Sequence, residues 1–146
     1  MKTRLSLTVN FLLLALIAVA CGVLPGAGAS PAGVQDRSSL IEALRGEGAT
    51  VEPGEPVEQA FFTVKGQILK VNGADVQVFE YETAEAMEVD AAQVSLDGGT
   101  IGTSMVTWVA APHFYKAGRI LVLYVGDDPA ILELLEGALD PQFAGR

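Results

Sequence analysis

The sequence predicts an α+β fold, with a mainly antiparallel sheet of about four to six strands and three helices. Three observations lead to this class. Asn72-Gly73, between two segments rich in β-branched residues, is the pair typical of a tight hairpin. Residues 120–125 are apolar throughout, as expected of a central strand that is covered on both faces. Other stretches have helical periodicity and follow residues that can cap a helix.

Three amphipathic segments predict the helices. The first begins at a capping box formed by Ser39 and Glu42, the second at Thr83, and the third at Asp128 followed by Pro129. The side chains expected to face the core are Leu40, Ile41, Leu44, Ala84, Met87, Ala91, Ile131, Leu132, Leu135 and Leu139. The acidic side chains expected on the solvent side are Glu82, Glu85, Glu88 and Asp90.

The strand-like segments are bounded by glycine, proline and asparagine. Residues 61–71 predict a strand with a bulge or bend at Gly66, and residues 75–81 predict its return strand, with one aliphatic and one aromatic face. The remaining expectations are a strand at 49–52, a turn at 52–56, a loop at 95–103, a strand at 104–110 that Pro112 interrupts, and a turn at 116–118.

An internal repeat is suggested by two glycine-led segments that align, 73–79 and 118–124. A helix start follows each segment, at Thr83 and at Asp128, so both halves have the order strand, turn, strand, helix. We expect the helices of such a repeat to pack on one face of the sheet.

The N-terminal segment has the features of a leader. Lys2 and Arg4 precede an apolar run at 9–20 that is broken only by Asn10, which is typical of a secretory signal peptide. The run is shorter than the roughly 20 apolar residues that span a bilayer, so a removed leader is favoured over a retained anchor. The expected organisation is a signal peptide at 1–20, a Gly/Ala/Pro-rich tether at 21–35 and a single domain at 36–146.

Two cleavage sites compete for this leader. Ala18-Val19-Ala20-Cys21 resembles a bacterial lipobox, which implies cleavage between Ala20 and Cys21 and a diacylglycerol on Cys21, although Ala18 stands where that motif usually has leucine. Ala27-Gly28-Ala29 instead matches an ordinary signal-peptidase site, and cleavage after Ala29 would discard Cys21 and secrete the chain. Lipidation is favoured because the single cysteine falls where the apolar run ends.

Composition excludes several classes of partner. The formal net charge is −9, and loss of Lys2 and Arg4 with a leader takes it to −11. Such a surface is a poor partner for nucleic acid and for anionic lipid headgroups, since both bind basic surfaces. With one cysteine there is no intramolecular disulfide, so stability must come from packing.

Three groups of residues are candidate sites. His113, the only histidine, could act as a general base, but neither a second histidine nor a cysteine of the domain is present to pair with it. An acidic cluster could hold a cation or supply paired carboxylates, although such a helix face is more often simply solvated. Its members are Glu80, Glu82, Glu85, Glu88 and Asp90. An aromatic ligand platform would form if no helix covers one sheet face, and its members would be Phe79, Tyr81, Trp108, His113, Phe114 and Tyr115. If a helix covers that face, the aromatics are core, which is the commoner outcome.

The segments SLIEALRGEGATVE and TSMVTWVAAPHFYKAGRILVLYVGDDPAILELLE, with the lipobox before them, resemble a group of small uncharacterised bacterial lipoproteins. The resemblance implies export and an acyl anchor on the extracytoplasmic side of a membrane, and it implies no activity. We therefore expect a lipid-anchored envelope protein that binds a protein or small ligand, without catalytic residues, metal or cofactor. The alternatives are an exported enzyme or metal-binding protein that uses the acidic cluster or His113, and an accessory or inhibitory subunit of a membrane complex.

Overall fold

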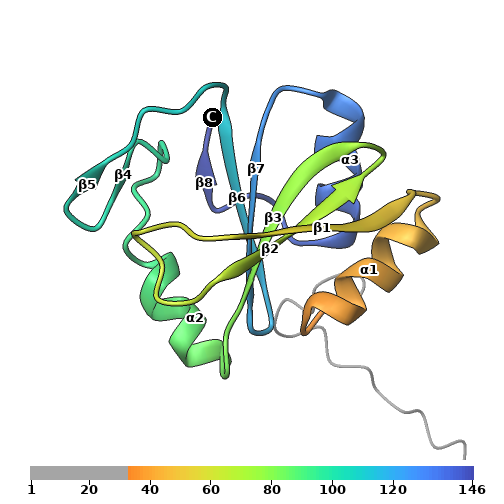
Figure 1. Ribbon diagram of the computed structural model, residues 1–146, viewed down its shortest axis with the longest axis horizontal. Helices are drawn as coiled ribbons and strands as arrows, with labels where there is room; N and C mark the ends of the chain where they lie inside the picture. The colour runs from red at the N-terminus through yellow and green to blue at the C-terminus, as the bar shows by residue number, and fades with distance from the viewer. Residues whose placement is uncertain (1–32) are drawn as a thin grey trace, which may run out of the picture.

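The computed structural model describes residues 33–146, and the leader, the lipobox and most of the tether lie outside the described residues (Figure 1). The main sheet has six antiparallel strands in the order β1-β2-β3-β7-β6-β8. Their bounds are β1 Val51–Val57, β2 Gly66–Val71, β3 Ala74–Glu80, β6 Pro112–Ala117, β7 Ile120–Val125 and β8 Ala144–Gly145. A small second sheet pairs β4, Thr100–Ile101, with β5, Ser104–Met105. The helices are α1 Arg37–Gly46, α2 Ala84–Ala91 and α3 Pro129–Ala138. The predicted α+β class is confirmed.

Local signals correctly predicted the hairpin and the starts of two helices, α2 and α3. Asn72 and Gly73 have φ values of 49° and 88° in the turn between β2 and β3, which is the conformation that a two-residue type I′ turn requires. Thr83 and Asp128 cap α2 and α3 as predicted. Helix α1 begins earlier than expected, because Asp36 is its N-cap and Ser39 occupies position N3 of the capping box rather than the N-cap.

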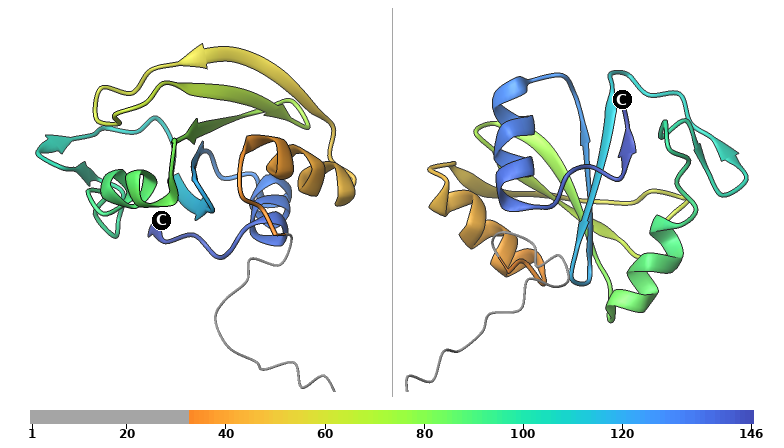
Figure 2. Two further views of the ribbon diagram at one scale, coloured as in Figure 1. Left: turned by 90° about the horizontal axis from the view of Figure 1, so that it is seen from below. Right: turned by 180° about the vertical axis from the view of Figure 1, so that it is seen from behind.

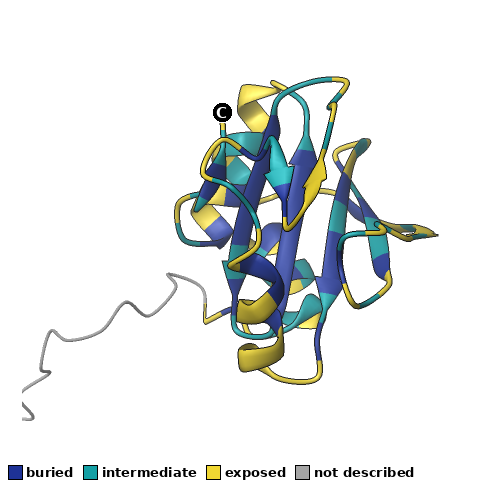
Figure 3. Cartoon of the chain, turned by 90° about the vertical axis from the view of Figure 1, so that its left-hand side faces the viewer, coloured by how far each residue is buried: buried dark blue, intermediate teal, exposed yellow. Residues whose placement is uncertain are grey.

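The helices cover both faces of the sheet, which corrects the expectation that they share one face. Val76 and Val78 of β3 pack into the cluster formed with α1 and α3, whereas Phe79 packs into the cluster formed with α2. Figure 2 shows α1 and α3 together on one side of β6 and β7, with α2 on the other. Buried positions accordingly run along the central strands in Figure 3, and β7 is covered on both faces as predicted.

The register between β3 and β7 explains why the helices of the two repeats lie on opposite faces of the sheet. Both repeats are present as element order, β2-β3-α2 and β6-β7-α3. Val76 aligns with Leu121 in sequence, but in the sheet Leu121 lies opposite Phe79 and Val76 lies opposite Tyr124. Because side chains alternate along a strand, Val76 and Leu121 point to opposite faces, and the helices that follow cover opposite faces.

Strand β1 runs through the segment expected to be a turn. Pro53 and Pro56 lie in this edge strand, and the ladder to β2 is irregular between them. Proline lacks the N–H of a ladder hydrogen bond, so an edge strand with a bulge is the part of a sheet that accepts it. Among the described residues, the prolines leave fewer N–H groups along β1 to which another strand could pair.

Strand β2 begins at Gly66 and not at residue 61. Gly66 is in regular register opposite Phe79, and a Cβ at this glycine would lie 2.7 Å from the Phe79 ring. The irregularity assigned to Gly66 therefore lies in β1 instead, and the glycine serves to admit an aromatic ring. Phe61 and Phe62 pack edge-to-face 4.9 Å apart in the preceding turn.

The strand expected at 104–110 is mostly a surface loop, and the strand β6 that follows was missed. Only β5, Ser104–Met105, is extended and paired, while Pro112 begins β6 rather than interrupting a strand. Proline is accepted at the first position of a strand. The turn after β6 is Gly118-Arg119, one residue later than expected.

Residues before α1 also belong to the core. Val34, expected at the end of the tether, is fully buried. The backbone carbonyl of Gln35 accepts a hydrogen bond of 2.9 Å from the Arg119 N–H. Within the described range, the structure contains no helix that combines the length and the hydropathy needed to cross a membrane.

Candidate functional site

The six residues proposed as an aromatic platform do not form an exposed face. Phe79, Phe114 and Tyr115 are fully buried, and Tyr81 is nearly so. They are also divided between the two faces of the sheet, because Tyr115 packs with α1 and α3 while the other three pack with α2. These aromatics are core residues. Trp108 is half-buried at the margin of this core.

His113 is buried and fixed by its neighbours. Its Nδ1 lies 2.5 Å from the Gln142 Oε1, and its ring stacks on Tyr124 with a centroid distance of 6.1 Å. The Nε2 atom is buried and has no hydrogen-bond partner among the described residues. A general base must reach the proton that it removes from a substrate, so this buried ring does not support a catalytic role.

The acidic cluster is dispersed. Glu80 lies 2.6 Å from Arg119 and 3.7 Å from Arg37, and Glu88 lies 2.6 Å from Lys116, so these carboxylates are paired with cations. Glu82 and Glu85 are exposed. Across residues 33–146, no group of three or more His, Cys, Asp or Glu side chains converges as a metal site would require.

Asp90, expected on the solvent side of α2, is instead fully buried. Its carboxylate accepts hydrogen bonds from the Thr63 N–H at 2.7 Å, the Thr63 hydroxyl at 2.9 Å, the Tyr81 hydroxyl at 2.9 Å and the Gln93 amide at 3.2 Å. Burial and this hydrogen bond to Asp90 raise the pKa of the Tyr81 hydroxyl well above its ordinary value. The network ties α2 to the turn before β2, and helical periodicity alone could not reveal it.

Hydrogen bonds to Asp97 stabilise the glycine-rich loop that follows α2. The Asp97 carboxylate accepts a hydrogen bond of 2.7 Å from the Ser95 hydroxyl and another of 3.0 Å from the Gly99 N–H. These two bonds hold the pKa of Asp97 below its usual value. The indole N–H of Trp108 donates to the Gly98 carbonyl at 2.7 Å. The loop is thus a small folded unit that holds the indole in place.

Residues 94–111, here called the apolar lobe, project beside α2 and include β4 and β5 (Figure 1). Leu96, Met105 and Val109 are 85%, 88% and 100% exposed. No charged residue occurs from position 98 to position 111, in a chain with 18 acidic residues. Three large apolar side chains therefore lie in water within this one short segment.

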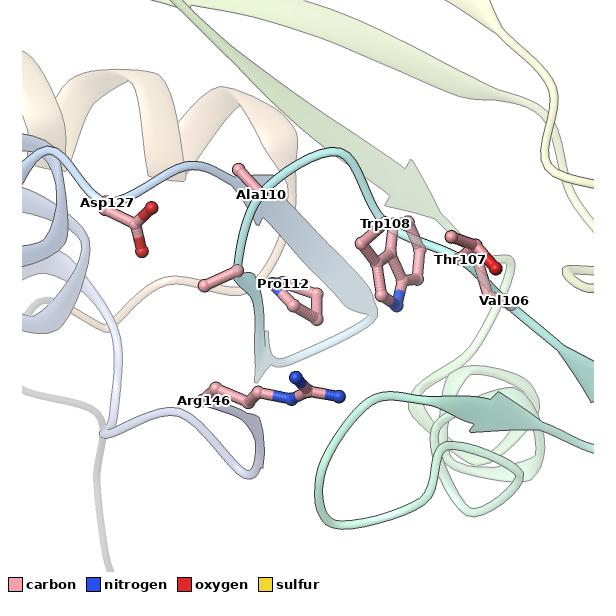
Figure 4. A pocket seen from close by; sticks show the side chains of 8 residues that line it. Val106, Thr107, Trp108, Ala110, Pro112, Asp127 and Arg146 are labelled. Atoms are coloured by element: carbon pink, nitrogen blue, oxygen red, sulfur yellow. The ribbon is translucent and has the colours of Figure 1, made fainter.

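A cavity of about 460 Å³ opens at the base of the apolar lobe (Figure 4). The indole of Trp108 and the ring of Pro112 line it together with two charged side chains, Asp127 and Arg146. The remaining lining residues are Val106, Thr107, Ala110 and Ala111. Of these residues, only Trp108 was a predicted site residue, since Asp127 and Arg146 lie far from it in sequence.

The fold and site together define an α+β domain with an exposed apolar lobe and an open cavity at its base. Comparisons with protein-family models, curated proteins and solved structures gave no match to this chain.

Proposed function

We propose that this protein is exported, is held at a membrane by a diacylglycerol on Cys21, and binds a partner protein through the apolar lobe. One observation carries the binding role: Leu96, Met105 and Val109, three of the four highly exposed large apolar residues in the described chain, lie within this one lobe. The fourth, Val89, lies on α2.

The distribution of charge supports a protein partner. Interfaces between proteins are depleted of charge at their centre, because each charged group that enters the interface must lose its water. The apolar lobe has no charge from position 98 to position 111, Asp97 lies directly before that stretch, and the chain as a whole has a formal charge of −9. An uncharged centre next to acidic groups fits a partner with an apolar patch and basic residues around it.

The position of the lobe agrees with attachment through the N-terminal side. The described chain begins beside α1, whereas β4 and β5 lie at the far side of the domain (Figures 1 and 2). A domain held to a membrane at its α1 side would therefore present the apolar lobe away from the lipid. A partner that is itself part of a membrane complex would make this chain an accessory subunit.

The anchor is tested by Cys21→Ser. We expect this variant to move from the membrane fraction to the soluble fraction, because the thiol that carries the acyl chains is missing. The wild-type mature protein should have the mass of a chain that begins at Cys21 plus its acyl groups. Recovery of a wild-type chain beginning at Ser30 would contradict the anchor and would establish cleavage after Ala29.

The binding role is tested by photo-crosslinking in intact cells. We would place a photoreactive residue at Thr103, which is exposed between β4 and β5, and expect one discrete protein adduct. Leu96→Ser, Met105→Ser and Val109→Ser combined should reduce that adduct roughly tenfold or more, since the apolar contact is lost. Stability should change little because the three side chains are exposed.

Val89→Ser is the matched control, because Val89 is also exposed, at 65%, but lies on α2. The adduct should persist in this variant. An equal loss in both variants, or adducts formed with lipid only, would overturn binding of a protein through the apolar lobe.

A further inference from the structure

We propose that the cavity beside Trp108 binds a short zwitterionic peptide, with its carboxylate on Arg146, its ammonium on Asp127 and its apolar side chains on the indole. The residues that line this cavity do not include Leu96, Met105 or Val109, and the proposal does not depend on the partner proposed for those three side chains.

The guanidinium of Arg146 is available for a ligand. The other basic residues at positions 33–146 all engage acceptors in the structure: Arg37, Arg45, Lys65, Lys70, Lys116 and Arg119. Arg146 makes no ion pair within 4 Å to any described carboxylate, although its backbone N–H donates to the Pro112 carbonyl at 3.2 Å. The Asp97 carboxylate interacts electrostatically with Arg146, but it already accepts hydrogen bonds from Ser95 and Gly99.

Asp127 supplies the opposite charge to the same cavity. Its neighbour Asp128 caps α3 by accepting from the Ala130 N–H at 2.9 Å, whereas Asp127 is exposed and takes part in no ion pair with a described residue. Asp127 and Arg146 therefore line one cavity without pairing with each other (Figure 4). A ligand that carries both charges would satisfy both side chains.

The overall charge selects a zwitterion over a simple ion. A formal charge of −11 without the leader residues Lys2 and Arg4 repels a free anion, and a free cation in this cavity would meet Arg146. A ligand with no net charge avoids both penalties.

Part of the cavity wall is apolar and can contact the side chains of the peptide. The indole N–H of Trp108 is already bonded to the Gly98 carbonyl, so the tryptophan contributes its apolar ring surface, next to Pro112 and Ala110. The volume of about 460 Å³ falls within the roughly 300–1,000 Å³ of small-ligand pockets. A dipeptide with aliphatic side chains matches this combination of size, charge and polarity.

The test uses the fluorescence of Trp108, the only tryptophan of the chain, in the full mature protein in detergent. Leucyl-leucine with free ends should change the emission in a saturable way. N-acetyl-leucyl-leucine and leucyl-leucinamide should each bind roughly tenfold or more weakly, because each lacks one of the two charges. Equal affinity for all three peptides, or no saturable change with any of them, would overturn the proposal.

Two variants assign each end of the peptide. Arg146→Gln should remove the preference for the free carboxylate over the amide and keep the preference for the free amine. Asp127→Asn should do the reverse. Lys65→Gln and Asp75→Asn, which change exposed charges elsewhere, should leave both preferences intact. If the two cavity variants alter both preferences alike, or alter neither, the assignment of the ends is wrong.

Discussion

Replacing Asp90 by alanine should lower the free energy of unfolding by about 3–5 kcal/mol, because a buried donor loses its acceptor and further hydrogen bonds are lost with it. The carboxylate is fully buried and accepts four hydrogen bonds. Its loss leaves the buried Tyr81 hydroxyl without an acceptor, which costs about 1–3 kcal/mol, and removes two hydrogen bonds from Thr63, which contribute about 1 kcal/mol each. Urea denaturation followed by circular dichroism measures the change.

Two further variants separate this network from a general effect of charge. Tyr81→Phe removes one donor and keeps the ring, so it should cost about 1 kcal/mol. Asp75→Ala removes an exposed carboxylate whose ion pair with Lys70 is at the surface, and it should change stability by less than about 1 kcal/mol. If Asp90→Ala proved no more destabilising than Asp75→Ala, the conclusion that the Asp90 network stabilises the fold would be wrong.

Gly118→Ala should be the second most damaging of these substitutions, with a loss of about 2–3 kcal/mol in the free energy of unfolding. Gly118 has φ of 50°, and left-handed backbone costs a residue with a Cβ about 1–2 kcal/mol. A Cβ here would also lie 2.4 Å from the Gln35 backbone. The segment before α1 must then move, which breaks the Arg119 N–H bond to the Gln35 carbonyl and adds about 1 kcal/mol.

Gly73→Ala is the matched control for this backbone approach. Gly73 also has positive φ, at 88°, but nothing lies within 4 Å of its Cβ position. Its substitution should cost only the backbone term of about 1–2 kcal/mol. Hydrogen exchange at the Arg119 amide should accelerate in Gly118→Ala and not in Gly73→Ala. Equal destabilisation by the two substitutions would show that contact with Gln35 contributes nothing.

Local chemistry allowed several elements to be predicted correctly. The Asn72-Gly73 turn, the caps at Thr83 and Asp128, and the doubly covered strand β7 depend on residues within a few positions of each other. The predictions failed where the conformation of a segment depends on its contacts with residues far away in the sequence. The prolines of β1 are compatible with a strand only because β1 lies at the sheet edge, and β6 is a strand because β7 and β8 pair with it.

The candidate sites show the same division. The aromatic platform was proposed on the condition that no helix covers its sheet face, and Asp90 was placed on the solvent side from helical periodicity. Burial depends on which helix covers which face, and the register between β3 and β7 puts the helices of the two repeats on opposite faces. The cavity at Trp108 joins the apolar lobe to residues 127 and 146, which no local pattern connects.

By itself the sequence determined the α+β class, the hairpin, the starts of α2 and α3 and the acidic charge, and it predicted a leader that ends at a single cysteine. Only the tertiary structure decided that Asp90 is a buried acceptor, that the aromatics are core, and that Trp108 shares a cavity with Asp127 and Arg146. The physical reason is that turns, caps and signal-type hydropathy are set by neighbouring residues. Burial and convergence are instead set by strand register and by the packing of segments far apart in the chain.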